Sequence, residues 1–154
     1  MTDGEVKSFF ESFNGQWNSY DILRRERASI LEDMASISAI DYTKTPVSGG
    51  GKSTDTSLLL ERIEKRIQDI TDAINRLVDA KLEALYMISL CDSGVQKGIL
   101  VDYYIRRLPW SEISDKYSYV KNQPLRIRDA AIHTIAQRYL PPEKRRQKMV
   151  TNGD

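Results

Sequence analysis

The sequence predicts an all-α protein in which a long antiparallel helical hairpin, coiled-coil-like, precedes a C-terminal helix-turn-helix domain. Two observations predict this fold. Apolar residues recur three and four positions apart over two long stretches, 17–40 and 58–90, which is the period of an amphipathic helix. Shorter helical segments follow over 92–140, and strand and helix patterns alternate nowhere along the chain.

The first residues are expected to add little to this fold. We expect residues 1–15 to form a flexible N-terminus, because no long periodic pattern occurs there and chain ends fray. Phe9, Phe10 and Phe13 could share one face of a short helix. A small docking motif for a partner is therefore the alternative interpretation.

Residues 16–91 are predicted to form the helical hairpin. Its second helix has a seam with spacings of four and three, interrupted by one charged residue, Lys81. The apolar members of this seam are Leu59, Ile63, Ile67, Ile70, Ile74, Leu77, Ala84 and Ile88. A helix of this length runs to about 50 Å and needs a partner along it. The helix over 17–40 is the nearest partner, and the resulting hairpin could also hold two copies together as a homodimer.

A glycine-rich loop, 44–57, joins the two helices and contains the letters GGGKST. A phosphate-binding loop requires G-x-x-x-x-G-K-[ST] directly after a buried strand. Pro46 stands where the first glycine is required, five positions before Gly51, and the residues ahead of it end a helix. We therefore expect a flexible inter-helix loop and no nucleotide site.

The segment 92–140 is predicted to be the helix-turn-helix domain. A two-turn helix over WSEISDKY is followed by a short polar linker and then by a longer helix, whose start near Gln123 is set by Pro124. In a helix-turn-helix the second helix enters the DNA major groove with its N-terminus first. The predicted core of this domain consists of Leu100, Tyr104, Trp110, Ile113, Ile127, Ala131 and Ile135.

Charge and residue type point to double-stranded DNA as the partner of this end. Residues 97–150 carry 12 Lys and Arg against 5 Asp and Glu, a surplus of +7. Asn122 and Gln123 can make bidentate contacts to adenine, and Arg126 can do so to guanine. The candidates for phosphate contacts are Arg106, Arg107, Lys121 and Arg128. Residues 141–154 are expected to form a basic flexible tail.

Two stretches of this domain carry a family resemblance. "ILVDYYIRRLPWSEISDKYSY" and the later "RIRDAAIHTI" are similar to the pattern of the phage regulators of the RinA and ArpU kind, whose C-terminal part resembles region 4 of sigma-70 factors. Two long helices around a glycine-rich loop, ahead of this pattern, are also similar. The resemblance implies transcriptional control of phage or prophage genes, commonly late or packaging genes, by binding promoter DNA near bacterial RNA polymerase.

Other classes of protein find less support in the sequence. One cysteine and one histidine exclude a disulfide framework and a cysteine-rich zinc site, and no acid-base or nucleophile cluster is recognisable. We therefore expect no enzyme activity, no catalytic residues, no cofactor and no metal. No apolar run approaches the roughly 20 residues of a membrane span, and the N-terminus lacks the pattern of a signal peptide, so we expect a cytoplasmic protein of the bacterial host cell.

Two alternatives to a regulator remain open at this stage. A small terminase-like DNA-packaging component would also bind DNA through a helix-turn-helix, but would assemble into a ring with a motor subunit. A coiled-coil protein-interaction module would use its basic end against an acidic protein surface, without binding DNA.

Overall fold

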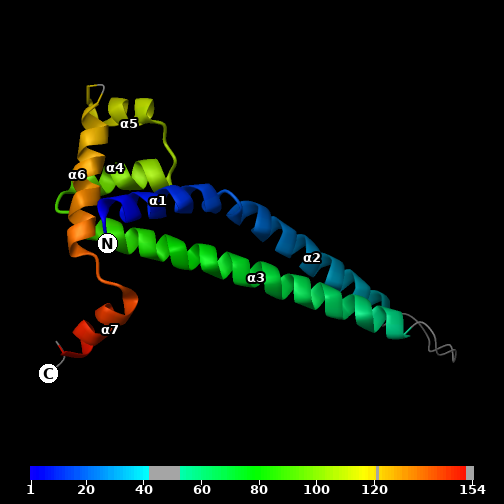
Figure 1. Cartoon of the computed structure of the whole chain (residues 1–154). Helices are drawn as coiled ribbons and strands as arrows, with labels where there is room; N and C mark the ends of the chain where they lie inside the picture. The colour runs from blue at the N-terminus through cyan, green and yellow to red at the C-terminus, as the bar shows by residue number, and fades with distance from the viewer. Residues whose placement is uncertain (42–52, 121, 152–154) are drawn as a thin grey trace. The chain divides into compact units, whose positions relative to one another are not determined.

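The computed structural model describes residues 1–41, 53–120 and 122–151, and within these ranges every regular element is a helix. The predicted all-α class is therefore confirmed. In the same ranges no helix combines the length and the apolar character needed to cross a bilayer. Figure 1 shows the helices in chain order.

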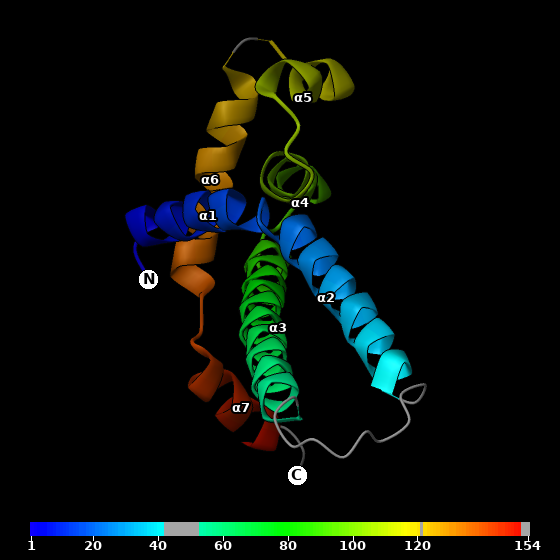
Figure 2. The ribbon, with the colours of Figure 1, turned by 90° about the vertical axis from the view of Figure 1, so that its right-hand side faces the viewer.

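Residues 16–80 form one of two compact units. It contains α2 (Tyr20–Asp41) and the first part of α3 (Ser53–Ser89), which run in opposite directions (Figures 1 and 2). An ion pair joins them, because Arg66 Nη2 on α3 lies 2.5 Å from Glu26 Oε1 on α2.

The apolar seam of α3 is covered unevenly in this unit. Ile70 and Leu77 are buried, whereas Leu59 is about half exposed. Continuous coiled-coil packing of the hairpin therefore stays a prediction. The predicted extent of the loop, 44–57, is wrong at its end: α3 already begins at Ser53, because a long helix extends at little cost once its first turn has formed. The earlier loop residues lie outside the described ranges.

Residues 1–15 and 81–154 form the other unit, so the segment predicted as an independent domain, 92–140, belongs to a larger body. Its later elements are α4 (Gly94–Leu100), the π-helix η1 (Val101–Ile105), α5 (Trp110–Tyr117), α6 (Gln123–Arg138) and α7 (Pro142–Thr151). Figures 1 and 2 show α4 beside the middle of α6 and α5 at the N-terminal end of α6. The core of this unit consists of Val6, Phe10, Phe13, Ala84, Met87, Ile88, Cys91, Ile99, Leu100, Tyr104, Ile113, Ala131, Ile132 and Ile135.

The N-terminal residues are part of this core, so the expectation of a flexible segment over 1–15 is wrong. Residues 3–17 form a helix, α1 (Asp3–Trp17). Its start is closed by reciprocal hydrogen bonds: Thr2 N donates to Glu5 Oε2 at 2.7 Å, and Glu5 N donates to Thr2 Oγ1 at 3.2 Å. The ring of Phe10 stacks on Tyr104 with centroids 4.8 Å apart. Burial of this apolar face outweighs the tendency of a chain end to fray.

The C-terminal tail is likewise helical over α7, so the expectation of a flexible segment from residue 141 is wrong for residues 142–151. One side chain explains its docking. Arg145 Nη2 donates to Glu83 Oε1 at 2.5 Å, and the guanidinium lies 3.6 Å from the ring centroid of Tyr86. A second ring, that of Tyr139, lies 5.6 Å away. An ion pair and a cation–π contact from one arginine therefore join α7 to the end of α3.

Candidate functional site

The turn between α5 and α6 presents the start of α6 to solvent. The helix α5 ends at Ser118, whose φ of 55° lies in the left-handed region, and Tyr119 N donates to Ser114 O at 2.9 Å. Pro124 is buried in the first turn of α6, where its missing N–H breaks no helical hydrogen bond. The N-cap, Asn122, makes no capping hydrogen bond with its side chain.

The three side chains predicted to read bases lie together on this turn. Asn122, Gln123 and Arg126 are all exposed. With Val120 they line an open hollow of about 330 Å³. The Asn122 amide is not used in capping, so its donor and acceptor remain available to a ligand. The first turn of a helix also carries partial positive charge, which favours an anionic partner.

A second, larger groove of about 390 Å³ adjoins this hollow between the starts of α4 and α6. Its wall is mostly apolar, and the Oε1 atom of Gln96 is buried there without a hydrogen-bond partner among the described residues. Gln123 and Arg126 line both cavities. The full lining of the larger groove is Ser93, Val95, Gln96, Tyr119, Gln123, Arg126, Ile127 and Ala130.

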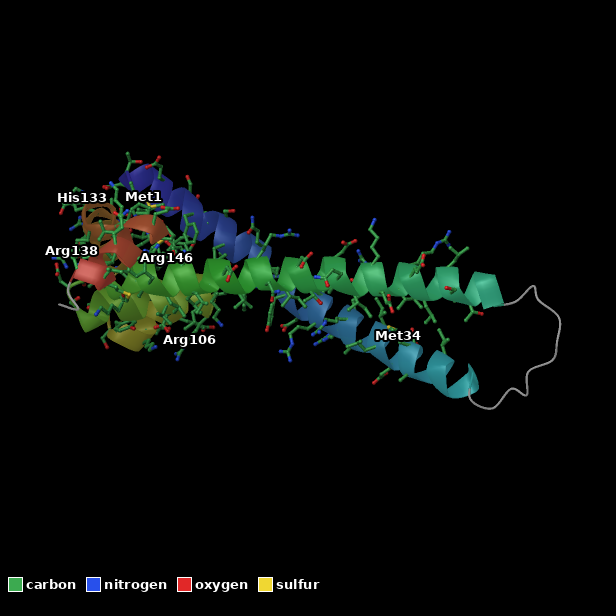
Figure 3. All side chains as sticks on the ribbon, turned by 90° about the horizontal axis from the view of Figure 1, so that it is seen from below. Met1, Met34, Arg106, His133, Arg138 and Arg146 are labelled. Atoms are coloured by element: carbon green, nitrogen blue, oxygen red, sulfur yellow. The ribbon has the colours of Figure 1, made fainter. Side chains whose placement is uncertain are left out.

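The four predicted phosphate contacts have different environments. Arg106, labelled in Figure 3, is exposed, and its Nη1 atom lies 3.4 Å from a carboxylate oxygen of Asp102. Arg107 Nη2 instead donates to the backbone oxygen of Asn14 on α1 at 3.0 Å. Lys121 lies outside the described residues.

Arg128, the fourth candidate, is used within its own unit. Only 14% of its side chain is exposed. Its guanidinium pairs with Asp129 at 2.8 Å and lies 5.6 Å from the ring centroid of Trp110. Among the described candidates, Arg106 is therefore the exposed one, whereas Arg107 and Arg128 are half-buried and contact other helices of their unit.

The predicted core residues of the helix-turn-helix are not all equally buried. Those that are buried are Leu100, Tyr104, Ile113, Ala131 and Ile135. Trp110 and Ile127 are half-buried. Trp110 stacks on Tyr103 with centroids 4.1 Å apart, and the Arg128 guanidinium lies 5.6 Å from the same ring.

The position of α5 depends on a buried carboxylate that the sequence patterns did not single out. Asp102, 1% exposed, accepts hydrogen bonds from Lys116 Nζ at 2.7 Å and from Tyr117 Oη at 3.0 Å. It lies in η1, where Arg106 N donates to Val101 O in the wider π-helical pattern. An acidic residue inside the apolar run "ILVDYYI" is the signal that could have identified it.

Close packing around this carboxylate depends on a glycine. A β-carbon at Gly98 in α4 would collide with the hydroxyl of Tyr117. Burial, and then the hydrogen bond to Asp102, raise the pKa of Tyr117 above its ordinary value of 10.0. The phenol therefore stays protonated and donates to Asp102 at neutral pH.

No family model, curated protein or solved structure matches this chain. Its function is therefore argued from its own geometry. Within the described ranges, no three or more His, Cys, Asp or Glu side chains come together in a way that could hold a metal ion. His133 and Arg138, labelled in Figure 3, both make contacts inside their unit: His133 Nδ1 lies 3.0 Å from Asp3 Oδ2, and Arg138 Nη1 donates to Leu90 O at 3.0 Å.

Proposed function

We propose that the protein is a non-enzymatic, sequence-specific regulator that binds double-stranded DNA and controls phage or prophage genes, with the N-terminal turn of α6 as its base-reading element. The observation that carries this proposal is the grouping of Asn122, Gln123 and Arg126 around one open hollow. Amide side chains pair bidentately with adenine, and arginine with guanine, on the major-groove edge. A ligand that presents such edges side by side matches this set of donors and acceptors.

The net charge of the C-terminal part of the chain supports the same proposal. The +7 surplus over residues 97–150 supplies the attraction to phosphates that all DNA-binding proteins use. The exposed cations of α7, among them Lys144, Arg146 and Lys148, extend that charge beyond α6. Phosphate contacts of this kind would orient the protein, and α6 would supply selectivity.

The test separates base contacts from phosphate contacts. Selection from random duplex DNA at two salt concentrations should give an enriched motif that survives the higher salt. With that motif as the probe, the Gln123→Ala/Arg126→Ala variant should lose discrimination at the contacted base pairs by about 1–3 kcal/mol for each good contact. Unchanged selectivity in this variant would contradict the assignment of α6 as the base-reading helix.

The matched control removes two cations without touching α6. The Arg146→Ala/Lys148→Ala variant, on exposed positions of α7, should weaken binding by a similar factor to every sequence. The logarithm of its binding constant should fall less steeply with the logarithm of the salt concentration. The slope should be smaller by about one for each phosphate that the variant no longer neutralises. A change in base preference in this control would mean that α7, and not α6 alone, reads sequence.

The unit of residues 16–80 is proposed as an arm for dimerisation or for contact with RNA polymerase. The exposed apolar side chains Ile22, Leu58 and Leu59 support an interaction role for it. The mass of the purified protein in solution discriminates among the functions considered. A monomer or dimer fits a regulator, whereas a ring of about eight or more copies would favour the packaging component. Absence of DNA binding at any salt concentration would favour the interaction module.

A further inference from the structure

Val120 lies beside the proposed base-reading residues with most of its side chain in water. It is 76% exposed, at the end of the turn that leads into α6. Its backbone oxygen accepts a hydrogen bond from Gln123 N at 2.9 Å, which fixes the turn relative to the helix. A β-branched side chain has few rotamers, which restricts the directions that this isopropyl group can take.

The hollow of about 330 Å³ has a mixed chemical character. Three of its four lining residues, Asn122, Gln123 and Arg126, offer hydrogen-bond donors or acceptors, and Val120 offers only apolar surface. A ligand complementary to this set must therefore present hydrogen-bonding groups beside one small apolar group. A polar ligand group placed against Val120 would lose its water without gaining a partner.

Base edges in the major groove contain one such apolar group. The C5-methyl of thymine is the only methyl group that the four standard bases present there, and it lies beside edge atoms that donate or accept hydrogen bonds. A methyl group on the base edge can therefore pack against Val120, while the neighbouring donor or acceptor pairs with Gln123 or Arg126.

We propose that Val120 is a specificity-determining residue that contacts the C5-methyl group of a pyrimidine, next to the base pair read by Gln123 or Arg126. This inference rests on the proposed function. It adds a requirement that hydrogen bonding alone does not impose, namely that one pyrimidine of the site carries a methyl group. Thymine and 5-methylcytosine both present this group.

The test replaces single thymines by uracil in the selected DNA site, which removes one methyl group and leaves every hydrogen-bonding atom in place. For the wild-type protein, one replacement should weaken binding about fourfold, the effect of exposing one buried methyl group. The Val120→Ala variant should bind the thymine and uracil forms of that position almost equally. If the position is a cytosine, its 5-methylated form should instead bind about fourfold more tightly to the wild type than to the variant.

Val150→Ala is the matched control, because Val150 is also 76% exposed but lies on α7. It should keep the full preference for the methylated site. Because both valines are exposed, both variants should keep the wild-type circular dichroism and unfolding midpoint.

The possible outcomes distinguish a failure of the inference from a failure of the proposed function. Sequence-specific binding that tolerates every loss of a methyl group overturns the inference and leaves the proposed function standing. A methyl preference that persists in Val120→Ala also overturns it, since another residue then makes the contact. If selection enriches no motif at all, the proposed function and the inference both fail.

Discussion

Lys116 Nζ donates a 2.7 Å hydrogen bond to Oδ2 of Asp102, a carboxylate that is 1% exposed. This contact joins α5 to η1, and α5 leads directly into the turn that carries the candidate site. Tyr117 Oη donates to the same oxygen, so the end of α5 is held by two side chains one position apart. The orientation of the turn therefore depends on a polar contact inside an otherwise apolar core.

Removing the lysine should weaken the fold. Lys116→Ala leaves the buried carboxylate with Tyr117 and the longer contact to Arg106, so we expect a loss of about 1–3 kcal/mol in the free energy of unfolding. Lys148→Ala, an exposed control, should change it by less than about 0.5 kcal/mol. In a double-mutant cycle with Asp102→Asn, the two losses should not add. Additivity within about 0.5 kcal/mol would show that the pair is not coupled.

Gly98 and Gly94 should respond differently to alanine. Alanine ordinarily stabilises a helix relative to glycine by about 1 kcal/mol. At Gly94 a β-carbon meets no atom within 4 Å, so Gly94→Ala should be neutral or stabilising. Gly98→Ala should destabilise, because its methyl group displaces the Tyr117 hydroxyl from Asp102. Thermal unfolding of both variants checks this, and Tyr117→Phe should recover part of the loss at Gly98 by removing the colliding oxygen.

The N-terminal helix should be required for stability. Phe10→Ala removes a fully buried ring stacked on Tyr104, and we expect a loss of about 3–5 kcal/mol in the free energy of unfolding. Ser8→Ala, on the exposed side of the same helix, should change stability by less than about 0.5 kcal/mol. Denaturant titration measures both. Small and equal losses of unfolding free energy in the two variants would show that residues 1–15 behave as a frayed end.

Alkaline pH should destabilise the protein through Tyr104. Burial raises the pKa of this phenol from 10.0 to about 12. Between these values the unfolded chain loses the proton while the folded protein keeps it, so the free energy of unfolding falls as pH rises from 10 to 12, by about 1–3 kcal/mol. Below pH 10 the phenol is neutral in both states and the stability is fully present.

Tyr104→Phe should reduce this dependence, and the raised pKa of Tyr117 should account for part of what remains. The Tyr104 hydroxyl finds no hydrogen-bond partner among the described residues, so the variant should lose less than about 1 kcal/mol at pH 7. Burial also raises the pKa of the Cys91 thiol from 9.0 to about 11, so the comparison is made in a Cys91→Ala background. An unchanged pH dependence in Tyr104→Phe would contradict the assignment.

Docking of α7 should depend on Arg145. Arg145→Ala removes both the ion pair with Glu83 and the stacking on Tyr86, and we expect faster amide hydrogen exchange over residues 142–151. Arg146→Ala removes a neighbouring exposed cation and should leave the exchange unchanged. Equal exchange in the two variants would show that Arg145 does not hold the helix.

The sequence by itself determined the helical class, the start of α6 and the closeness of the candidate residues to one another. These features depend on local patterns: apolar spacings in α3, Pro124 at the start of α6, and the closeness of Asn122, Gln123 and Arg126 along one turn. Neighbours three or four positions apart on a helix lie on one face whatever the rest of the chain does.

Only the tertiary structure decided which of the remaining side chains are free to contact a ligand and which are used inside the protein. Phe10 stacks on a residue 94 positions away, Arg145 pairs with one 62 positions away, and Arg107 reaches Asn14 across 93 positions. Such contacts depend on which helices meet, and helical periodicity carries no information about that. For this reason two segments expected to be flexible are helical, and two arginines expected to meet phosphates make contacts within their own unit.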